Sequence, residues 1–273
     1  MPERPSPRPS PLETRAQRNT VAALRAAGCV FAEEEAGLLI SAARDAAEVA
    51  VLLERRCTGL PLEHVLGRAE FCGLRISVAP GVFVPRRRTG FLVRQAAALV
   101  APRSRGPTRV FDLCCGSGAV GAAIAAAVGG VELHAVDIDP VAVRCAQTNL
   151  RASGGHAYEG DLYRPLPPRL RGHVDVLVAN APYVPTAAIA LMPAEARVHE
   201  PRIALDGGAD GLDVQRRVIA AAAGWLAPGG HLLVETSERQ AAGTVVACEG
   251  SGLAARLVRS EELDATVAIA RTC

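Results

Sequence analysis

The sequence predicts an α/β fold, with a mainly parallel sheet covered by helices on both faces and a small helical N-terminal domain. Two observations support this prediction. From Arg109 onward, segments typical of buried strands alternate with segments typical of helices. The first of these strands is followed by a glycine loop and a helix, an order that places helix N–H groups at the mouth of a binding site. Apolar residues make up 49% of the 273 residues, enough for a sizeable core.

The N-terminal part is predicted to be helical after a short tail. Residues 1–11 are rich in Pro and Arg, so we expect them to be disordered, and they lack the apolar core of a signal peptide. Helical segments at residues 12–27, 32–43 and 45–57 are too few and too short for a large domain, so residues 12–59 should form a small helical one. No apolar run reaches the roughly 18 residues of a membrane span, and we therefore expect a cytoplasmic protein.

A connector and a β-hairpin are predicted at residues 60–90. Residues 70–78 alternate enough to be one strand of the hairpin, with residues 82–84 as its partner. Three arginines, Arg86, Arg87 and Arg88, follow before a helix at residues 91–100. This run is interpreted either as a solvated face or as a lip of the active site that receives an acidic group or a backbone carbonyl.

The main domain is expected at residues 91–273. Its strands are short apolar runs bounded by turn signals, and its helices carry Ala-rich or amphipathic patterns. Strands are predicted at residues 109–113, 131–136, just before Gly160, and at 174–179, 231–235, 252–258 and 265–270. Helices are predicted at residues 119–128, 141–151 and 212–226. The last two strands are expected to close the sheet as a pair.

A glycine loop follows the first strand. The spacing of Gly116, Gly118 and Gly121 matches the dinucleotide fingerprint, and glycines let a ligand approach the backbone. A small-residue turn without a ligand would look the same. The next strand favours a ligand, because it leads into Asp137, whose carboxylate could accept both hydroxyls of a ribose. The alternative for Asp137 is a helix-capping or loop carboxylate.

Four predicted strands end in polar or glycine-rich segments. In open α/β sheets, ligands bind beyond the carboxyl ends of the strands. Residues 112–118, Asp137, Asp161 and Asn180 all lie at or near such ends, and their convergence is harder to explain by structure alone than any one of them. Asp161 could accept a hydrogen bond from an adenine amino group, or it could be an ordinary loop carboxylate.

The most informative tetrapeptide is Asn180, Ala181, Pro182 and Tyr183. An Asn side-chain oxygen and a neighbouring backbone carbonyl give two fixed acceptors, which suit the two donors of a planar NH2 group. Tyr183 adds a flat surface and a hydroxyl. The arrangement would position an amide or amino nitrogen for attack on an electrophile held by the glycine loop. The alternative is an ordinary Asn-Pro-type turn.

With these motifs the chain resembles the class I S-adenosylmethionine-dependent methyltransferases, whose fold is Rossmann-like. It is more closely similar to the protein-(glutamine-N5) methyltransferases that modify the Gly-Gly-Gln loop of peptide release factors. The resemblance runs from about Leu60 to the C-terminus. It is carried by Glu70-Phe-x-Gly73, Val84-Pro-Arg86 with Thr89, Asp112-Leu-x-x-Gly-Ser-Gly118, Asn180-x-Pro-Tyr183, Glu200-Pro-x-x-Ala-Leu-Asp-Gly-Gly-x-Asp-Gly211, Pro228-Gly-Gly and residues 235–240. The block at 200–211 is distinctive, because a generic methyltransferase or dehydrogenase has no reason to carry it.

The resemblance implies S-adenosyl-L-methionine as the cofactor and assigns roles to individual residues. Residues of the cofactor site would be Asp112, Cys114, Cys115, Gly116, Ser117, Gly118, Asp137, Asp161, Leu162 and Asn180. Within that site, residues 114–118 would line the methionine end, Asp137 would hold the ribose, and Asp161 with Leu162 would flank the adenine. Catalytic residues would be Asn180, Ala181, Pro182 and Tyr183, with Asn180 and the Ala181 carbonyl accepting from the substrate amide. No metal is implied, and the sequence shows no cluster of metal ligands.

Several positions depart from the family pattern. Ala181 stands where the family usually has Pro, and Cys114-Cys115 stand where it commonly has Gly-Thr. Residues 87–90 read Arg-Arg-Thr-Gly instead of Pro-Glu-Thr-Glu, which removes two carboxylates, and the helical N-terminal region is short. These departures indicate a divergent relative, for which a different protein substrate is plausible.

The expected reaction is methyl transfer from S-adenosyl-L-methionine to the side-chain nitrogen of a glutamine in an exposed protein loop, a release factor being one such partner. Three rivals remain. An adenine-N6 nucleic-acid methyltransferase uses the same motif, but the chain shows no target-recognition domain and a net charge of only +2, so neither nucleic acid nor membrane is expected as a partner. A nicotinamide dehydrogenase would leave residues 180–183 and 200–211 unexplained. The third rival is a cofactor-binding protein that has lost catalysis.

Overall fold

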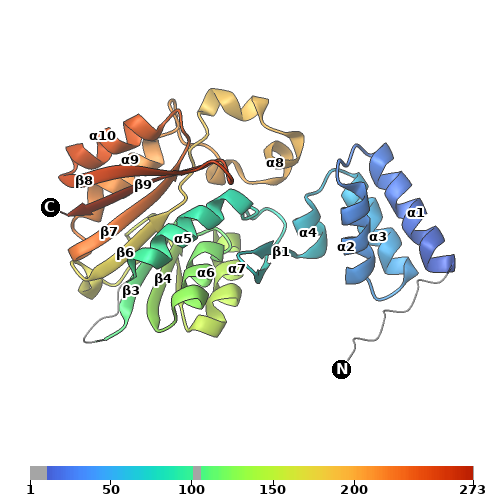
Figure 1. The fold of residues 1–273 in the computed structure, drawn as a ribbon, viewed down its shortest axis with the longest axis horizontal. Coiled ribbons are helices and arrows are strands. Elements are labelled where there is room, and N and C mark those ends of the chain that lie inside the picture. Colours follow the sequence, from blue (N-terminus) through green and yellow to red (C-terminus); the bar gives the residue numbers. More distant parts are fainter. Residues whose placement is uncertain (1–10, 101–105, 273) are drawn as a thin grey trace. The chain divides into compact units, whose positions relative to one another are not determined.

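The computed structural model describes residues 11–100 and 106–272, which form two compact units dividing between Leu66 and Gly67 (Figure 1). The first unit is helical, with α1 (Pro11–Ala26), α2 (Ala32–Ala42), α3 (Ala46–Cys57) and α4 (Leu62–Leu66). The three helices predicted there are confirmed to within about two residues, whereas most of the predicted disordered tail lies outside the described residues. Its core contains Leu24, Ala32, Ala36, Leu39 and Val65.

The second unit is built on a seven-stranded sheet in the order β5-β4-β3-β6-β7-β9-β8. The strands are β3 (Thr108–Leu113), β4 (Val131–Asp137), β5 (His156–Glu159), β6 (Val174–Ala179), β7 (Leu226–Thr236), β8 (Leu253–Ser260) and β9 (Ala265–Thr272). Neighbours from β5 to β7 pair in parallel, and β9 pairs antiparallel with both β7 and β8. The predicted, mainly parallel sheet with a closing pair of strands is therefore confirmed.

Helices cover both faces of this sheet (Figure 1). One face packs against α5 (Gly90–Leu99), α6 (Ala119–Val128) and α7 (Pro140–Leu150), and the other against α9 (Asp213–Ala222) and α10 (Ala241–Gly250). Adjacent residues of a central strand serve opposite faces: Val110 faces the first group of helices and Phe111 the second. Because both faces are buried, the central strands read as continuous apolar runs.

The strand order of the sheet reverses at β3: β4 and β5 follow on one side of it, and β6 and β7 follow on the other. The pairing register places the carboxyl ends of β3, β4, β6 and β7 side by side. Leu113 pairs with both Val136 and Ala179, and Ala179 pairs with Val234. In open α/β sheets such a switch point opens a crevice where ligands bind. The segments after β3, β4, β5 and β6 therefore meet at one edge, as the sequence predicted.

The hairpin prediction is wrong in its pairing. Strands β1 (Arg68–Phe71) and β2 (Leu74–Ser77) pair with each other. The second half of β1 and all of β2 lie within the segment predicted as a single strand. Cys72 and Gly73 turn the chain between them with φ of 50° and 77°. Residues 82–84 form no strand; Val82 and Val84 are instead buried in the core from the irregular segment between β2 and α5. Their alternation reflects that burial and not strand pairing.

Two other boundaries differ from the prediction. Helix α9 ends at Ala222, four residues before β7 begins at Leu226. The Pro228-Gly-Gly segment lies inside β7, where the register with β6 is irregular between Val174 and Val176. Gly230 is needed at this irregularity, because a Cβ there would lie 2.6 Å from the carbonyl oxygen of Val174. No helix within residues 11–100 or 106–272 is long and apolar enough to cross a membrane.

Candidate active site

In the loop between β3 and α6 and the first turn of α6, each of three glycines is needed for a different structural reason. Gly116 has φ 54°, and a Cβ added to it would meet no atom within 4 Å, so this side of the loop is open. Gly118 has φ 75°, and its Cβ would lie 3.0 Å from that of Ala146 on α7. A Cβ on Gly121 would lie 3.1 Å from Asp112 Oδ2. Gly118 and Gly121 thus serve close packing, while Gly116 leaves room for a ligand against the backbone.

Asp112, near the end of β3, hydrogen-bonds to the first turn of the helix that follows this loop. Its side chain is buried, and its Oδ2 accepts a hydrogen bond of 2.8 Å from the Gly121 N–H. Burial, together with the negative charge of Asp137, raises the pKa of Asp112 to about 7, although the hydrogen bond from the Gly121 N–H lowers it. The contacts of Asp112 are therefore with the chain itself, and it holds the start of α6 against β3.

Asp137, at the end of β4, ties the loop to the neighbouring strand. Its Oδ2 accepts from the Gly116 N–H at 2.7 Å and its Oδ1 from the Asp139 N–H at 2.9 Å. Burial raises the pKa of this carboxyl, and the two N–H groups lower it. A carboxylate has about four lone-pair positions, so both oxygens keep the capacity to accept from ribose hydroxyls.

The two cysteines and Ser117 complete the loop. Cys115 and Ser117 are buried and Cys114 is half-buried. Burial, followed by the charge of Asp137, raises the pKa of both thiols, so they remain protonated at neutral pH. The loop is also held by Asn149 of α7, whose Nδ2 donates to the Ser117 carbonyl at 2.8 Å. Sequence reasoning did not identify Asn149.

Asp161 follows β5 and is joined there by an arginine that sequence reasoning also missed. Arg217 of α9 donates from Nη2 to Asp161 Oδ2 at 2.6 Å. The next residue, Leu162, has φ 49° and is half-buried. An amino group that hydrogen-bonds to Asp161 would therefore share the carboxylate with Arg217.

Asn180 extends beyond the end of β6 and is half-buried. Its Nδ2 donates to the Thr89 hydroxyl at 3.4 Å, which leaves the side-chain oxygen as the acceptor end of the amide. Ala181 is 1% exposed, so its carbonyl belongs to a backbone segment fixed by packing. Tyr183 is half-buried, and burial raises its pKa, with the charge of Glu235 as the next cause.

The distinctive block at residues 200–211 braces this tetrapeptide. Val184 forms a parallel bridge with Asp206. The Val184 N–H donates to the Leu205 carbonyl at 2.9 Å, and the Gly207 N–H donates to the Val184 carbonyl at 2.9 Å. Gln240 of the β7–α10 turn donates from Nε2 to the carbonyls of Tyr183, at 2.8 Å, and Asp210, at 2.9 Å. The block and the glutamine thus lock the loop that follows Asn180.

Two glycines of the block permit this close approach. A Cβ on Gly207 would lie 2.7 Å from the Pro182 carbonyl oxygen, and one on Gly211 would lie 2.3 Å from that of Tyr183. Both separations are too short for real side chains. The sequence pattern of the block is therefore explained by the backbone it must touch.

Only part of the arginine run lies in solvent. Arg87 and Arg88 are exposed, whereas Arg86 donates from Nη2 to both oxygens of the buried Glu200 at 2.6 and 2.7 Å. Glu200 also accepts from the Val84 N–H at 3.1 Å. Arg86 thus receives an acidic group, as one interpretation anticipated, but that group comes from the chain itself. The pair joins the block at 200–211 to the connector after the hairpin.

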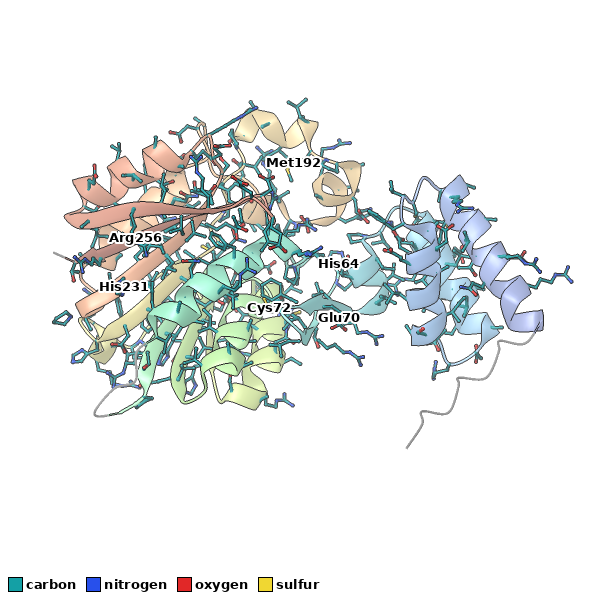
Figure 2. All side chains as sticks on the ribbon, viewed as in Figure 1. His64, Glu70, Cys72, Met192, His231 and Arg256 are labelled. Carbon is teal, nitrogen blue, oxygen red and sulfur yellow. The ribbon has the colours of Figure 1, made fainter. Side chains whose placement is uncertain are left out.

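The departure at Gly90 has a local counterpart. Gly90 begins α5 beside the turn of the β1–β2 hairpin, where Figure 2 labels Cys72 and Glu70. A Cβ at position 90 would lie 3.3 Å from Cys72 Sγ. A glutamate here, as in the family pattern, would have to displace that thiol.

Comparison with known proteins gives consistent matches. A family model described as "Methyltransferase small domain" matches residues 74–208. The chain is 38% identical over 192 residues to the release factor glutamine methyltransferase of Geobacter sulfurreducens, covering 70% of this chain and 65% of that one. It is 39% identical over 198 residues to that of Gloeobacter violaceus, covering 71% and 68%. It is also 39% identical over 193 residues to a 4-amino-L-phenylalanine/4-methylamino-L-phenylalanine methyltransferase of Streptomyces pristinaespiralis, covering 70% and 65%. The chain thus spans about two thirds of the length of these relatives.

Solved structures agree on the fold. The 16S rRNA N2 G1207 methyltransferase of Thermus thermophilus matches with a TM-score of 0.54 and 22% identity, covering 76% of this chain and 50% of that one. A methyltransferase from Pyrococcus furiosus matches with a TM-score of 0.53 and 15% identity, covering 72% and 88%. Both likenesses confirm the predicted Rossmann-like methyltransferase fold.

Proposed function

The chain belongs to the family of release factor glutamine methyltransferases, and we propose that it transfers the methyl group of its cofactor, S-adenosyl-L-methionine, to the side-chain amide nitrogen of a protein glutamine. The observation that carries this proposal is the Asn180 amide, fixed at the carboxyl edge of the sheet with Nδ2 bonded to Thr89. This arrangement leaves the Asn180 oxygen and the neighbouring Ala181 carbonyl as two acceptors for one NH2 group.

The residues at the edge of the sheet fit the cofactor. The open side of Gly116 admits a ligand against the loop, and the Asp137 oxygens retain lone pairs for ribose hydroxyls. The Asp161 carboxylate could accept a hydrogen bond from an adenine amino group while it also accepts from Arg217. When bound, S-adenosyl-L-methionine supplies an electrophilic methyl group on a sulfonium centre.

Asn180 and Ala181 would act on the nucleophile. An amide nitrogen is a poor nucleophile, because its lone pair is delocalised into the carbonyl. Holding both N–H groups would fix the nitrogen in line with the methyl carbon, and such positioning can remove about 7–11 kcal/mol from a barrier. The two acceptors would stabilise the positive charge that the nitrogen gains on receiving the methyl group, until the nitrogen releases a proton to solvent.

The Gly-Gly-Gln loop of a release factor is the acceptor we propose. Glycine neighbours would let its backbone enter the pocket beside Tyr183 without steric conflict. Gln240 and residues 200–211 hold the backbone of Tyr183 and Val184 in place. Since release factors work in the cytoplasm, we propose that location for the protein.

A second acceptor is favoured by one comparison. The Streptomyces pristinaespiralis relative is named for an aromatic amino acid, and its 39% identity equals that of the Gloeobacter violaceus relative. In this chain, Arg88 stands where the family pattern has a carboxylate. A free amino acid carrying an aromatic amine is therefore the second candidate.

A panel of acceptors separates the two candidates. The protein is incubated with labelled methyl donor and, separately, with a release factor, the same factor lacking the loop glutamine, 4-amino-L-phenylalanine and DNA. We expect label on the intact release factor and none on the factor without its glutamine. Label on the amino acid alone would transfer the assignment to the second candidate, and label on DNA alone would contradict both.

A further inference from the structure

Glu235 is a buried carboxylate beside Asn180. It follows Val234 on β7, just as Asn180 follows Ala179 on β6, and Ala179 pairs with Val234 in the sheet. The two side chains therefore begin from neighbouring positions at the carboxyl edge. Glu235 is 3% exposed, and within the described residues its Oε2 has no hydrogen-bond partner. Burying a carboxylate in this way is costly, so its presence calls for a role.

Thr89 connects Glu235 to Asn180. Thr89 is buried, and its hydroxyl accepts from Asn180 Nδ2 at 3.4 Å. A hydrogen bond from the same side chain acts to lower the pKa of Glu235. The distance to Asn180 is long, as catalytic hydrogen bonds often are before substrate binds. Thr89 is the N-cap residue of α5. Phe91 and Leu92 pack this end of the helix into the core, so the position of Thr89 is fixed.

The direction of these hydrogen bonds is set by chemistry. An ionised carboxylate only accepts, and a hydroxyl has a single proton to donate. When Glu235 is ionised, Thr89 therefore donates to it and can only accept from Asn180. Under that constraint the Nδ2 of Asn180 faces Thr89, and Oδ1 is directed away from it.

We infer that Glu235, acting through Thr89, selects the orientation of the Asn180 amide in which oxygen, and not NH2, meets the methyl-accepting nitrogen. This inference rests on the proposed function and deepens it. The flipped amide would present N–H donors to an NH2 group, so a hydrogen bond would be replaced by a repulsive contact. Glu235 and Thr89 are therefore positioning residues.

The ionised form of Glu235 is required for this role. Burial raises the pKa of Glu235, whereas the Thr89 hydrogen bond and the positive charge of Arg88 lower it. Arg88 stands where the family pattern has a glutamate. Its charge therefore favours the carboxylate that accepts from Thr89.

Kinetics of three variants test the inference. Thr89→Val removes the hydroxyl at nearly constant shape, Glu235→Gln allows the bond direction to reverse, and Thr89→Ser keeps the hydroxyl. We expect the first two to lower kcat about tenfold or more, the scale for a misplaced polar group, with cofactor affinity within about twofold. Thr89→Ser should stay within about threefold of the wild type. Thr244→Val is the matched control, since it removes a buried hydroxyl bonded to Gln215 and Thr236.

A spectroscopic readout separates this inference from the proposed function. The side-chain NH2 resonances of Asn180, identified by their loss in Asn180→Ala, should move in Thr89→Val and Glu235→Gln and remain close to wild type in Thr89→Ser and Thr244→Val. If they move while no glutamine is methylated, the proposed acceptor is wrong and the orientation stands. Resonances that do not move in Thr89→Val overturn the inference, and so does wild-type kcat in that variant.

Discussion

Asn180 is the residue on which the proposed chemistry depends. We expect Asn180→Ala to lower kcat by roughly 100-fold or more, the scale for losing one preorganised polar group. Cofactor affinity should remain nearly intact, because Asn180 is assigned chiefly to the acceptor amide. Steady-state kinetics and calorimetry measure the two quantities. Equal turnover in mutant and wild type would remove Asn180 from the mechanism.

Asp112 predicts a pH dependence of stability. Its pKa in the folded protein is about 7, above the ordinary value of 3.8, because it is buried. Between about pH 4 and pH 7 the folded state keeps a proton that the unfolded state has released, so the free energy of unfolding falls as pH rises through this window. The contribution is on the order of 4 kcal/mol.

Asp112→Asn tests this directly, because its amide oxygen can still accept from the Gly121 N–H. Chemical denaturation at pH 4, 5.5 and 7 should show a shallower decline than in the wild type. An unchanged decline in the variant would mean that another group causes the dependence.

Sequence reasoning at this scale identified residues but not their partners. Asp137, Asp161 and Asn180 were found because polar residues after apolar strands are a local signal. The ion pair of Arg217 with Asp161 joins residues 56 positions apart, and that of Arg86 with Glu200 joins residues 114 apart. No periodicity links such positions, so only the folded chain reveals the contacts.

At the scale of elements, the block at residues 200–211 acts as a brace on the loop after β6. We expect Gly211→Ala to damage this brace, because its Cβ would lie 2.3 Å from the Tyr183 carbonyl oxygen. Gly252→Ala is the matched control, with φ 74° against 80° and no atom within 4 Å of the added Cβ. Both variants carry the cost of a left-handed backbone, about 1 kcal/mol or slightly more.

The difference between the two variants isolates the contact. Gly211→Ala should lower the melting temperature further than Gly252→Ala and should also reduce methyl transfer. Thermal melting and a turnover assay on both proteins measure this. Equal losses of melting temperature and turnover in the two variants would show that the close approach at Gly211 contributes to neither stability nor activity.

The boundaries of some elements could be predicted from the sequence alone. Strand β6 and helix α6 begin and end at the predicted residues, because a strand buried on both faces and an Ala-rich helix ending in two glycines both give strong local patterns. The β1–β2 hairpin was misread, because burial alternates on both sides of Cys72 and Gly73 and a two-residue turn leaves that alternation almost unbroken. Helix α10 was not predicted.

At the scale of the whole molecule, the topology of the sheet gathers the site. Segments that are far apart in sequence meet because β3, β4, β5 and β6 are parallel and end at the same edge. The fold class and the set of strand-end residues could therefore be predicted. The positions of Thr89 and Glu235 beside Asn180 could not, because they depend on how α5 and β7 pack against β6.

The most direct test of the account is the position of the methyl group in the product. A release factor is treated with labelled S-adenosyl-L-methionine and either wild-type protein or Asn180→Ala, and fragment mass spectrometry locates the label. The account predicts one methyl group on the side-chain nitrogen of the Gly-Gly-Gln glutamine with the wild type, and little or none with the variant. A methyl group on any other atom of the release factor, or equal labelling by both proteins, would contradict it.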